Sequence, residues 1–167
     1  CMEKINGASK LLLSLINEVL DMSKIESGRL ILSEDEFNVG ELLQDLVVMM
    51  QPEIKNKQQT LNIHVKNLRH ENVKGDTQRI KQVLMNILSN AIKYTPENGK
   101  IAIRLSMTEQ NYSLSVFNSG SYISSTDVEA IFERFYQVDG HQAGTGIGLA
   151  LVRAFVEMHG GNIAAHS

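Results

Sequence analysis

The segment from Ile80 to Tyr94 (IKQVLMNILSNAIKY) constrains the fold more than any other part of the chain. Its apolar residues recur at intervals of three and four, at positions 80, 83, 84, 87, 88, 91 and 92, which predicts a helix with one buried face. Asn86, Asn90 and Lys93 are spaced four and then three residues apart, so they share a second face of that helix. Two carboxamides and an ammonium group on one stripe suit a site for a metal ion and phosphate groups. The alternative is that each is an ordinary solvated side chain.

A glycine-rich segment, Gly144-Thr-Gly-Ile-Gly148, leads into another predicted helix over about 147–159, which Gly160 and Gly161 would end. Glycines let backbone N–H groups approach an anion, and the N-terminus of a helix favours negative charge. The segment is not a P-loop, because no Gly-Lys-Ser/Thr follows it, and it lacks the spacing of the dinucleotide-binding fingerprint. A flexible loop without a ligand is the alternative. Together with the amide stripe, the segment favours ATP binding.

Composition excludes several classes of protein. The chain has 167 residues, 43% of them apolar and 21% charged, which is typical of one folded domain or of a domain with an arm. The net charge of −3, without a basic block, argues against nucleic-acid binding. The single cysteine, Cys1, allows no internal disulfide, and no apolar run approaches the roughly 18 residues of a membrane span. We therefore expect a cytoplasmic domain, and membrane contact only through parts of a parent protein outside this sequence.

The N-terminal segment predicts a helix that belongs to a bundle. Apolar residues form a heptad seam at positions 5, 8, 12, 15, 19 and 22, and Leu13, Ile16 and Leu20 form a second stripe beside it. No helix of matching pattern occurs in the chain, so the expected partner is a second chain or a segment upstream. An ordinary packed helix is the alternative. The polar stretch around Gly28 predicts a boundary near residues 26–37.

The remaining patterns predict an α+β fold, with helices on one side of a mainly antiparallel sheet. Asn38 and Glu41 form the capping-box pattern of a helix that Pro52 kinks or ends, and Asp76 caps the central helix. Alternation predicts a strand over 61–65 and a hairpin of strands over 101–107 and 112–116, with its turn near 109–111. A short helix should open at Ser125 or Thr126 and bury Val128, Ile131, Phe132 and Phe135. Short strands are also predicted at 30–32 and 163–165.

These motifs, in this order, resemble the boxes of sensor histidine kinases. IKQVLMNILSNAIKYTPENGKI is similar to their N box, and VFNSG (116–120) lies where the G1 box is found. IFERFYQ (131–137) resembles the F box, GTGIGLALV (144–152) resembles the G2 box, and LLSLINEVLDMSKIESGRL (12–30) resembles the second helix of the dimerisation and histidine-phosphotransfer domain. The resemblance implies a Bergerat-type two-layer α/β sandwich over 31–167, preceded by a partial dimerisation domain over 1–30.

The resemblance also implies roles for individual residues. Asn90 would coordinate Mg²⁺, Asn86 would line the phosphate site, Lys93 would contact a phosphate, and Tyr94 would border the nucleotide. Phe132 and Phe135 would seat a lid over 138–145, although plain core packing is the alternative for both. The other residues implied in ATP binding are Asn118, Gly120, Gly144, Thr145, Gly146, Ile147, Gly148 and Leu149.

The sequence departs from the family pattern at three places. None of His64, His70, His141, His159 and His166 has the context of the phosphoacceptor, so that histidine is expected upstream, on the absent first helix. Asn118 replaces the aspartate that accepts from the adenine amino group; its amide oxygen can still accept, and a decayed adenine pocket is the alternative. The chain stops at Ser167, so we expect the sheet to lack an edge strand.

Asn86 bears on the reaction, because related ATPases carry a glutamate there to activate water. An amide cannot act as a general base, which predicts little hydrolysis and favours phosphoryl transfer to histidine. The expected function is Mg²⁺-ATP-dependent phosphorylation of a histidine, for relay to an aspartate on a response-regulator receiver domain. The alternative is a degenerate, non-catalytic module for nucleotide sensing or scaffolding. Dimerisation through the N-terminal helix is expected in the intact protein.

Overall fold

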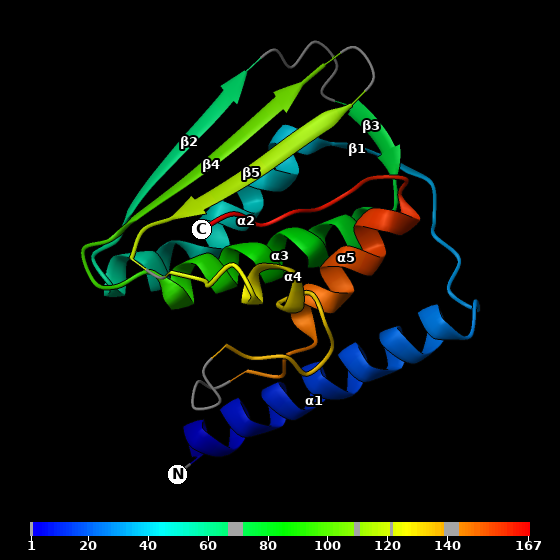
Figure 1. Cartoon of the computed structure of the whole chain (residues 1–167), viewed down its shortest axis with the longest axis horizontal. Helices are drawn as coiled ribbons and strands as arrows, with labels where there is room; N and C mark the ends of the chain where they lie inside the picture. The colour runs from blue at the N-terminus through cyan, green and yellow to red at the C-terminus, as the bar shows by residue number, and fades with distance from the viewer. Residues whose placement is uncertain (1, 67–71, 109–110, 121, 139–143) are drawn as a thin grey trace. The chain divides into compact units, whose positions relative to one another are not determined.

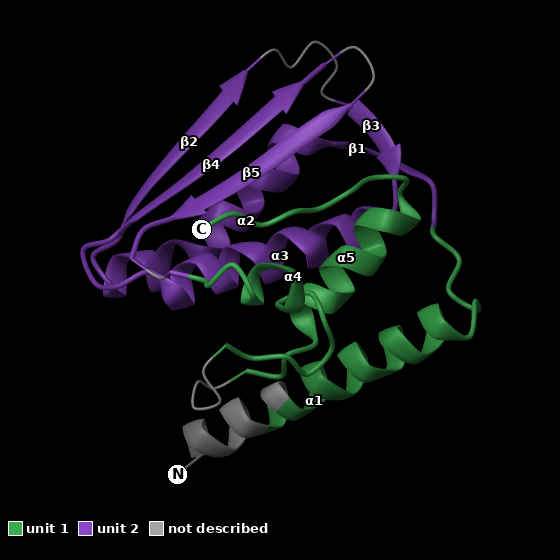
Figure 2. Cartoon of the chain, viewed as in Figure 1, with its two compact units in different colours: residues 1–32, 123–167 green, residues 33–122 purple. Residues whose placement is uncertain are grey.

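The computed structural model describes residues 2–66, 72–108, 111–120, 122–138 and 144–167, with side chains described in the first helix for residue 9 and from residue 12 onward. The chain forms two compact units (Figure 2). Unit 1 comprises Cys1–Leu32 and Ile123–Ser167, and unit 2 comprises Ser33–Tyr122. The division into domains at residues 1–30 and 31–167 stays a prediction.

Unit 2 is a two-layer sandwich of helices and a sheet (Figure 1). The sheet has the order β2-β4-β5, built from Thr60–Lys66, Lys100–Met107 and Tyr112–Asn118. β2 pairs with β4 in parallel, and β4 pairs with β5 antiparallel. A second, two-stranded antiparallel sheet joins β1 (Asp35–Asn38) to β3 (Asn72–Gly75). The strands predicted over 61–65, 101–107 and 112–116 are confirmed, whereas β1 and β3 were not predicted.

Helices α2 (Val39–Asn56) and α3 (Thr77–Tyr94) cover one face of the three-stranded sheet (Figure 1). Both begin at the caps that the sequence predicts: Asn38 Oδ1 accepts from the Glu41 amide at 3.0 Å, and Asp76 Oδ1 accepts from the Arg79 amide at 3.0 Å. Pro52 lies inside α2, which continues past it to Asn56, so the prediction that Pro52 could end the helix is wrong. Val48 loses the bond from residue 52, but it is 62% exposed, so water can replace that bond.

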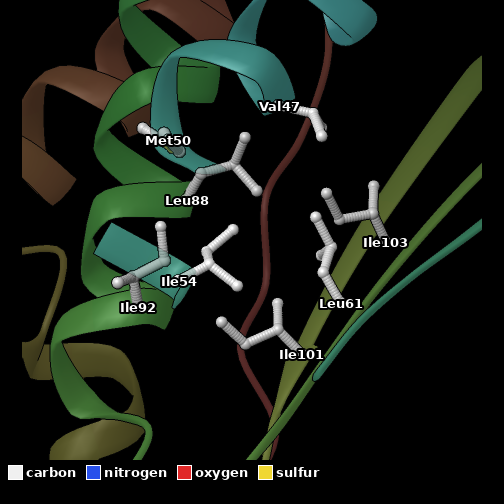
Figure 3. A pocket seen from close by; sticks show the side chains of 8 residues that line it. All are labelled: Val47, Met50, Ile54, Leu61, Leu88, Ile92, Ile101 and Ile103. Atoms are coloured by element: carbon white, nitrogen blue, oxygen red, sulfur yellow. The ribbon is translucent and has the colours of Figure 1, made fainter. Parts of the chain in front are cut away.

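The core of unit 2 lies between these helices and the inward face of the sheet. Strand alternation places Ile101, Ile103 and Leu105 on that face, each at most 3% exposed. Figure 3 shows side chains from α2, α3, β2 and β4 pointing toward one another around a small gap in this core. Its volume is about 10 Å³, which is about the space of one water molecule, so it is a packing gap and not a ligand site.

The described residues of unit 1 form the helices α1 (Met2–Glu26), α4 (Asp127–Ala130) and α5 (Gly148–Met158). α1 and α5 pack against each other (Figure 2). α5 ends as predicted: Gly160, at φ +75°, donates to Glu157 O, and Gly161 donates to Val156 O at 2.9 Å. No strand forms at 30–32 or at 163–165, so both predictions are wrong, because neither segment has a strand partner in the described part of the chain.

From residue 12 onward, the apolar stripes of α1 are largely uncovered. Met22 is buried, but five other side chains are 47–61% exposed, namely Leu12, Leu13, Ile16, Val19 and Leu20. That a partner outside this sequence covers these side chains stays a prediction. Within the described residues, no helix is both long and apolar enough to cross a membrane.

Candidate functional site

The amide stripe predicted on the central helix forms on α3. Val83, Leu84 and Leu88 lie on its buried face, whereas Asn86, Asn90 and Lys93 are half-buried on another. The Asn90 side chain makes no hydrogen bond to any residue that the structure describes. Its amide oxygen is therefore available as a neutral ligand, which is the kind of atom that Mg²⁺ accepts beside water and phosphate oxygens. No group of three or more His, Cys, Asp or Glu residues in the described ranges could hold a metal alone.

Lys93 and Tyr94 form a pair at the end of α3. The Lys93 ammonium donates to the Tyr94 hydroxyl at 3.1 Å and lies 4.6 Å from the centre of the Tyr94 ring. The Tyr94 ring is 39% exposed. The cation can bind an anionic group, and the accessible aromatic ring beside it can contact a planar base. The pair therefore offers both a common place to bind.

The candidate residues Asn118 and Gly120 lie next to the turn that follows α3. Asn118 is half-buried at the end of β5, where it pairs with Ile101. Gly120 adopts φ +102°, and a Cβ atom at this position would lie 2.5 Å from Cδ of Pro96. Any other residue would collide with the turn, so the glycine keeps the end of β5 close to the end of α3.

In unit 1, the structure separates the two phenylalanines that the sequence places together. Phe132 follows α4 and is 7% exposed, as predicted. Phe135 is 70% exposed and adopts φ +62°, so the prediction that it packs inward is wrong. The reason is that α4 stops at Ala130, so helical spacing does not continue to residue 135.

The backbone of Phe135 instead fits against the glycine-rich segment. Its amide donates to Gly146 O at 2.8 Å. Gly146 adopts φ +68°, and a Cβ atom there would lie 2.7 Å from both Cα and C of Phe135. This close approach explains why residue 146 is a glycine.

The other residues of the glycine-rich segment lead into α5. The Gly144 carbonyl accepts from Gln137 Nε2 at 2.8 Å, and Gly148 begins α5 after the buried Ile147. Leu149 is half-buried in the first turn of α5. Most of the predicted lid, residues 139–143, lies outside the described residues.

Thr145 connects this segment to α1. Its hydroxyl donates to Glu18 Oε2 at 2.9 Å and accepts from the Ile147 amide at 3.1 Å. Arg134 forms an ion pair with Glu26, also on α1. The sequence patterns did not predict these two contacts, because nothing near Glu18 or Glu26 in the chain indicates a distant partner.

A polar cluster holds the segment between α4 and Phe135. Asp127 accepts from the Ser124 hydroxyl and from the Tyr136 hydroxyl, each at 2.6 Å. These two bonds, that from Ser124 first, hold the pKa of Asp127 below its usual value, and the bond to Asp127 raises the pKa of Tyr136. Thr126 caps α4 without a side-chain hydrogen bond, and the Ser124 hydroxyl accepts from the Asp127 amide instead.

The histidines that the structure describes do not have the position of a phosphoacceptor. His159 is half-buried at the C-terminal cap of α5, where its Nδ1 lies 2.7 Å from Phe155 O. His64 is exposed on β2, and His166 is exposed near the end of the chain. His70 and His141 lie outside the described residues.

Two residues that the sequence patterns missed contact the end of α3. Lys57 Nζ and Gln59 Nε2 both donate to backbone carbonyls there, including those of Ile92 and Thr95. In the sequence, Lys57 looks like any surface lysine after a helix, so no local signal reveals the contact.

Comparison with known proteins shows the family of the chain. The family described as "Histidine kinase-, DNA gyrase B-, and HSP90-like ATPase" matches residues 75–167, which include both the amide stripe and the glycine-rich segment. The sensor protein GacS of Pseudomonas syringae pv. syringae is 41% identical over 165 residues, which cover 93% of this chain and 18% of that protein. The chain thus spans about a fifth of the length of the curated relatives that it matches.

Solved structures of histidine kinases share the fold. Full-length ShkA in complex with AMPPNP gives a TM-score of 0.85 at 27% identity, covering 96% of this chain and 34% of that one. ThkA in complex with the response regulator protein TrrA gives a TM-score of 0.75 at 32% identity, covering 94% and 43%. The predicted Bergerat-type fold is confirmed. The chain therefore belongs to the family of histidine kinase-, DNA gyrase B- and HSP90-like ATPases, and its relatives there are sensor histidine kinases.

Proposed function

We propose that this chain binds Mg²⁺-ATP and supplies the ATP-binding half of a phosphoryl transfer to a histidine on another helix. The observation that carries the proposal is the amide stripe of α3, where the Asn90 oxygen is available beside Lys93. Support comes from the match of residues 75–167 to an ATPase family and from the AMPPNP that the ShkA structure contains.

The residues of α3 act on the phosphates. Asn90 holds Mg²⁺, which neutralises charge on the phosphate oxygens, and Lys93 adds a positive point charge. Asn86 lines the phosphate site but cannot take a proton from water, so hydrolysis is slow. The phosphoryl group then leaves when the imidazole nitrogen of the acceptor forms a bond to the γ-phosphorus and the bond to the ADP oxygen breaks.

The glycine-rich segment binds the phosphates through its backbone. Gly144, Gly146 and Gly148 carry no side chain that would block an approaching phosphate, and the 11-residue helix α5 begins there with its positive pole. Thr145, Ile147 and Leu149 lie in the same segment, and Phe132 anchors the chain before it. Asn118 and Gly120 bind the adenine side of the nucleotide, together with Tyr94.

Titration with a fluorescent ATP analogue, with and without Mg²⁺, tests binding. Asn90→Ala should weaken binding in the presence of Mg²⁺ by at least about tenfold and make it insensitive to Mg²⁺. Gln78→Ala is the matched control, because Gln78 is an exposed carboxamide in the first turn of the same helix. Equal affinity of the wild type and the Asn90 variant would refute the role of Asn90.

Transfer is tested by mixing the chain with a protein that carries the histidine helix and labelled ATP. Label on the histidine that depends on Asn90 supports the kinase. Binding without transfer favours the alternative, a nucleotide-sensing or scaffolding module. The presence of Asn118 in place of the expected aspartate is the observation that favours this alternative. Negligible ATP binding by both the wild type and Asn118→Ala would indicate a decayed adenine pocket.

We also propose two protein partners. The ThkA–TrrA complex supports a response-regulator receiver domain as the final acceptor of the phosphoryl group. The exposed leucine and isoleucine side chains of α1 support dimerisation of the intact protein through this helix. Sedimentation at several concentrations tests the second proposal, and a strictly monomeric chain would contradict it.

A further inference from the structure

The last turn of α3 is bound by side chains from the end of α2. The Lys57 ammonium donates to the carbonyls of Ile92 at 2.8 Å, Lys93 at 2.9 Å and Thr95 at 3.3 Å. These acceptors match the three N–H donors of an ammonium group. Gln59, which is 8% exposed, donates through Nε2 to Ile92 O at 3.0 Å and to Thr95 O at 2.7 Å. Four of these five bonds are 3.0 Å or shorter.

The way α2 ends explains how one short segment supplies both side chains. Gln58 adopts φ +53° and donates to Lys55 O, and the Gln59 amide donates to Ile54 O, both at 3.0 Å. This is the Schellman pattern, in which the chain reverses sharply at the left-handed residue. Lys57 and Gln59 lie on either side of the reversal, and both side chains reach the same carbonyl groups.

Because Lys57 is charged, this contact affects the electrostatics at the end of α3 as well as its stability. The C-terminal carbonyls of a helix carry a partial negative charge of about half an electron, which repels an anion near the last turn. Lys93 and Tyr94 belong to that turn, so ATP bound to them would face this charge. The Lys57 ammonium is hydrogen-bonded to those carbonyls and neutralises them.

We infer that Lys57 is a positioning residue of the nucleotide site: it fixes the last turn of α3 and cancels the negative end of the helix dipole beside the phosphates. Lys57 itself acts through α3 and not by contact with ATP. The inference rests on the proposed binding of ATP at Lys93 and Tyr94.

The test compares nucleotides of different charge, because a purely structural residue would affect them equally. Lys57→Met should raise the Kd for ATP about three- to tenfold over that of the wild type. The Kd for ADP should rise less, and the Kd for adenosine should stay within about twofold of the wild-type value. Lys57→Arg, which keeps the charge, should stay within about twofold of the wild type for all three. Lys55→Met is the matched control, since Lys55 is exposed in the last turn of α2, and it should change none of the three.

The outcomes separate the two proposals. If the wild type binds ATP and Lys57→Met weakens ATP, ADP and adenosine equally, or none of them, the inference is overturned while the proposed function stands. If the wild type binds no nucleotide, the proposed function fails and the inference fails with it. If Lys57→Met does not fold, Lys57→Gln and Lys57→Arg decide: a loss of affinity in the neutral glutamine variant that is larger for ATP than for adenosine supports the inference, and an equal loss or no loss overturns it.

Discussion

Replacement of Gly146 by alanine tests whether the glycine-rich segment depends on its contact with Phe135. The new Cβ atom would lie 2.7 Å from Cα and C of Phe135 and 3.1 Å from its carbonyl oxygen, all of which are backbone atoms. The Phe135 amide is itself hydrogen-bonded to Gly146 O at 2.8 Å, so the two segments cannot separate without losing that bond. Alanine at φ +68° would add backbone strain.

The strain and the close contact together set the expected loss in the free energy of unfolding. The left-handed conformation costs a residue with a Cβ about 1–2 kcal/mol. The overpacking against backbone adds about 1–3 kcal/mol. Gly146→Ala should therefore lower the free energy of unfolding by about 2–5 kcal/mol. Gly160→Ala is the control, because Gly160 has a similar φ of +75° but no atom within 4 Å of its Cβ position. That control should cost only about 1–2 kcal/mol.

Urea denaturation of both variants measures the difference, and titration with ATP measures its consequence for binding. Gly146→Ala should lose more stability than Gly160→Ala by about 1–3 kcal/mol and should bind ATP more weakly. Gly160→Ala should bind ATP like the wild type. If the two variants lose equal stability at equal m-values, close approach to Phe135 is not what requires the glycine.

Three further predictions concern single side chains. Asn38→Ala removes the cap that accepts from the Glu41 amide and should cost about 1 kcal/mol of unfolding free energy in urea. Burial raises the pKa of Asp76, but hydrogen bonds from backbone amides outweigh it and hold that pKa below 3.8. The ionised Asp76 therefore stabilises the fold at higher pH, and that stabilisation is lost as pH falls below about 3.8; Asp76→Asn should reduce this pH dependence of the unfolding free energy. Tyr136→Phe removes one donor to Asp127 and should raise the pKa of that carboxyl toward its usual value, as measured by NMR titration.

Much of unit 2 could be predicted because its signals are local. Helix caps at Asn38 and Asp76 are recognised within three residues of the helix start, and both form as predicted. The alternation that defines β4 needs no knowledge of its neighbours, because one face of the sheet is buried along its length. The short strands β1 and β3 were not predicted, because each has four residues, which are too few to show an alternating pattern.

Local patterns were enough to predict the helices and principal strands, the placement of Asn86, Asn90 and Lys93 on one face of α3, and the family of the chain. The exposure of Phe135, the close approach of Gly146 to it, and the contact of Lys57 with a helix end 35 residues further along the chain became visible only in the folded structure. The difference lies in how far apart the interacting residues are in the sequence. Periodicity and capping express interactions among residues a few positions apart, whereas these contacts join segments that only folding brings together.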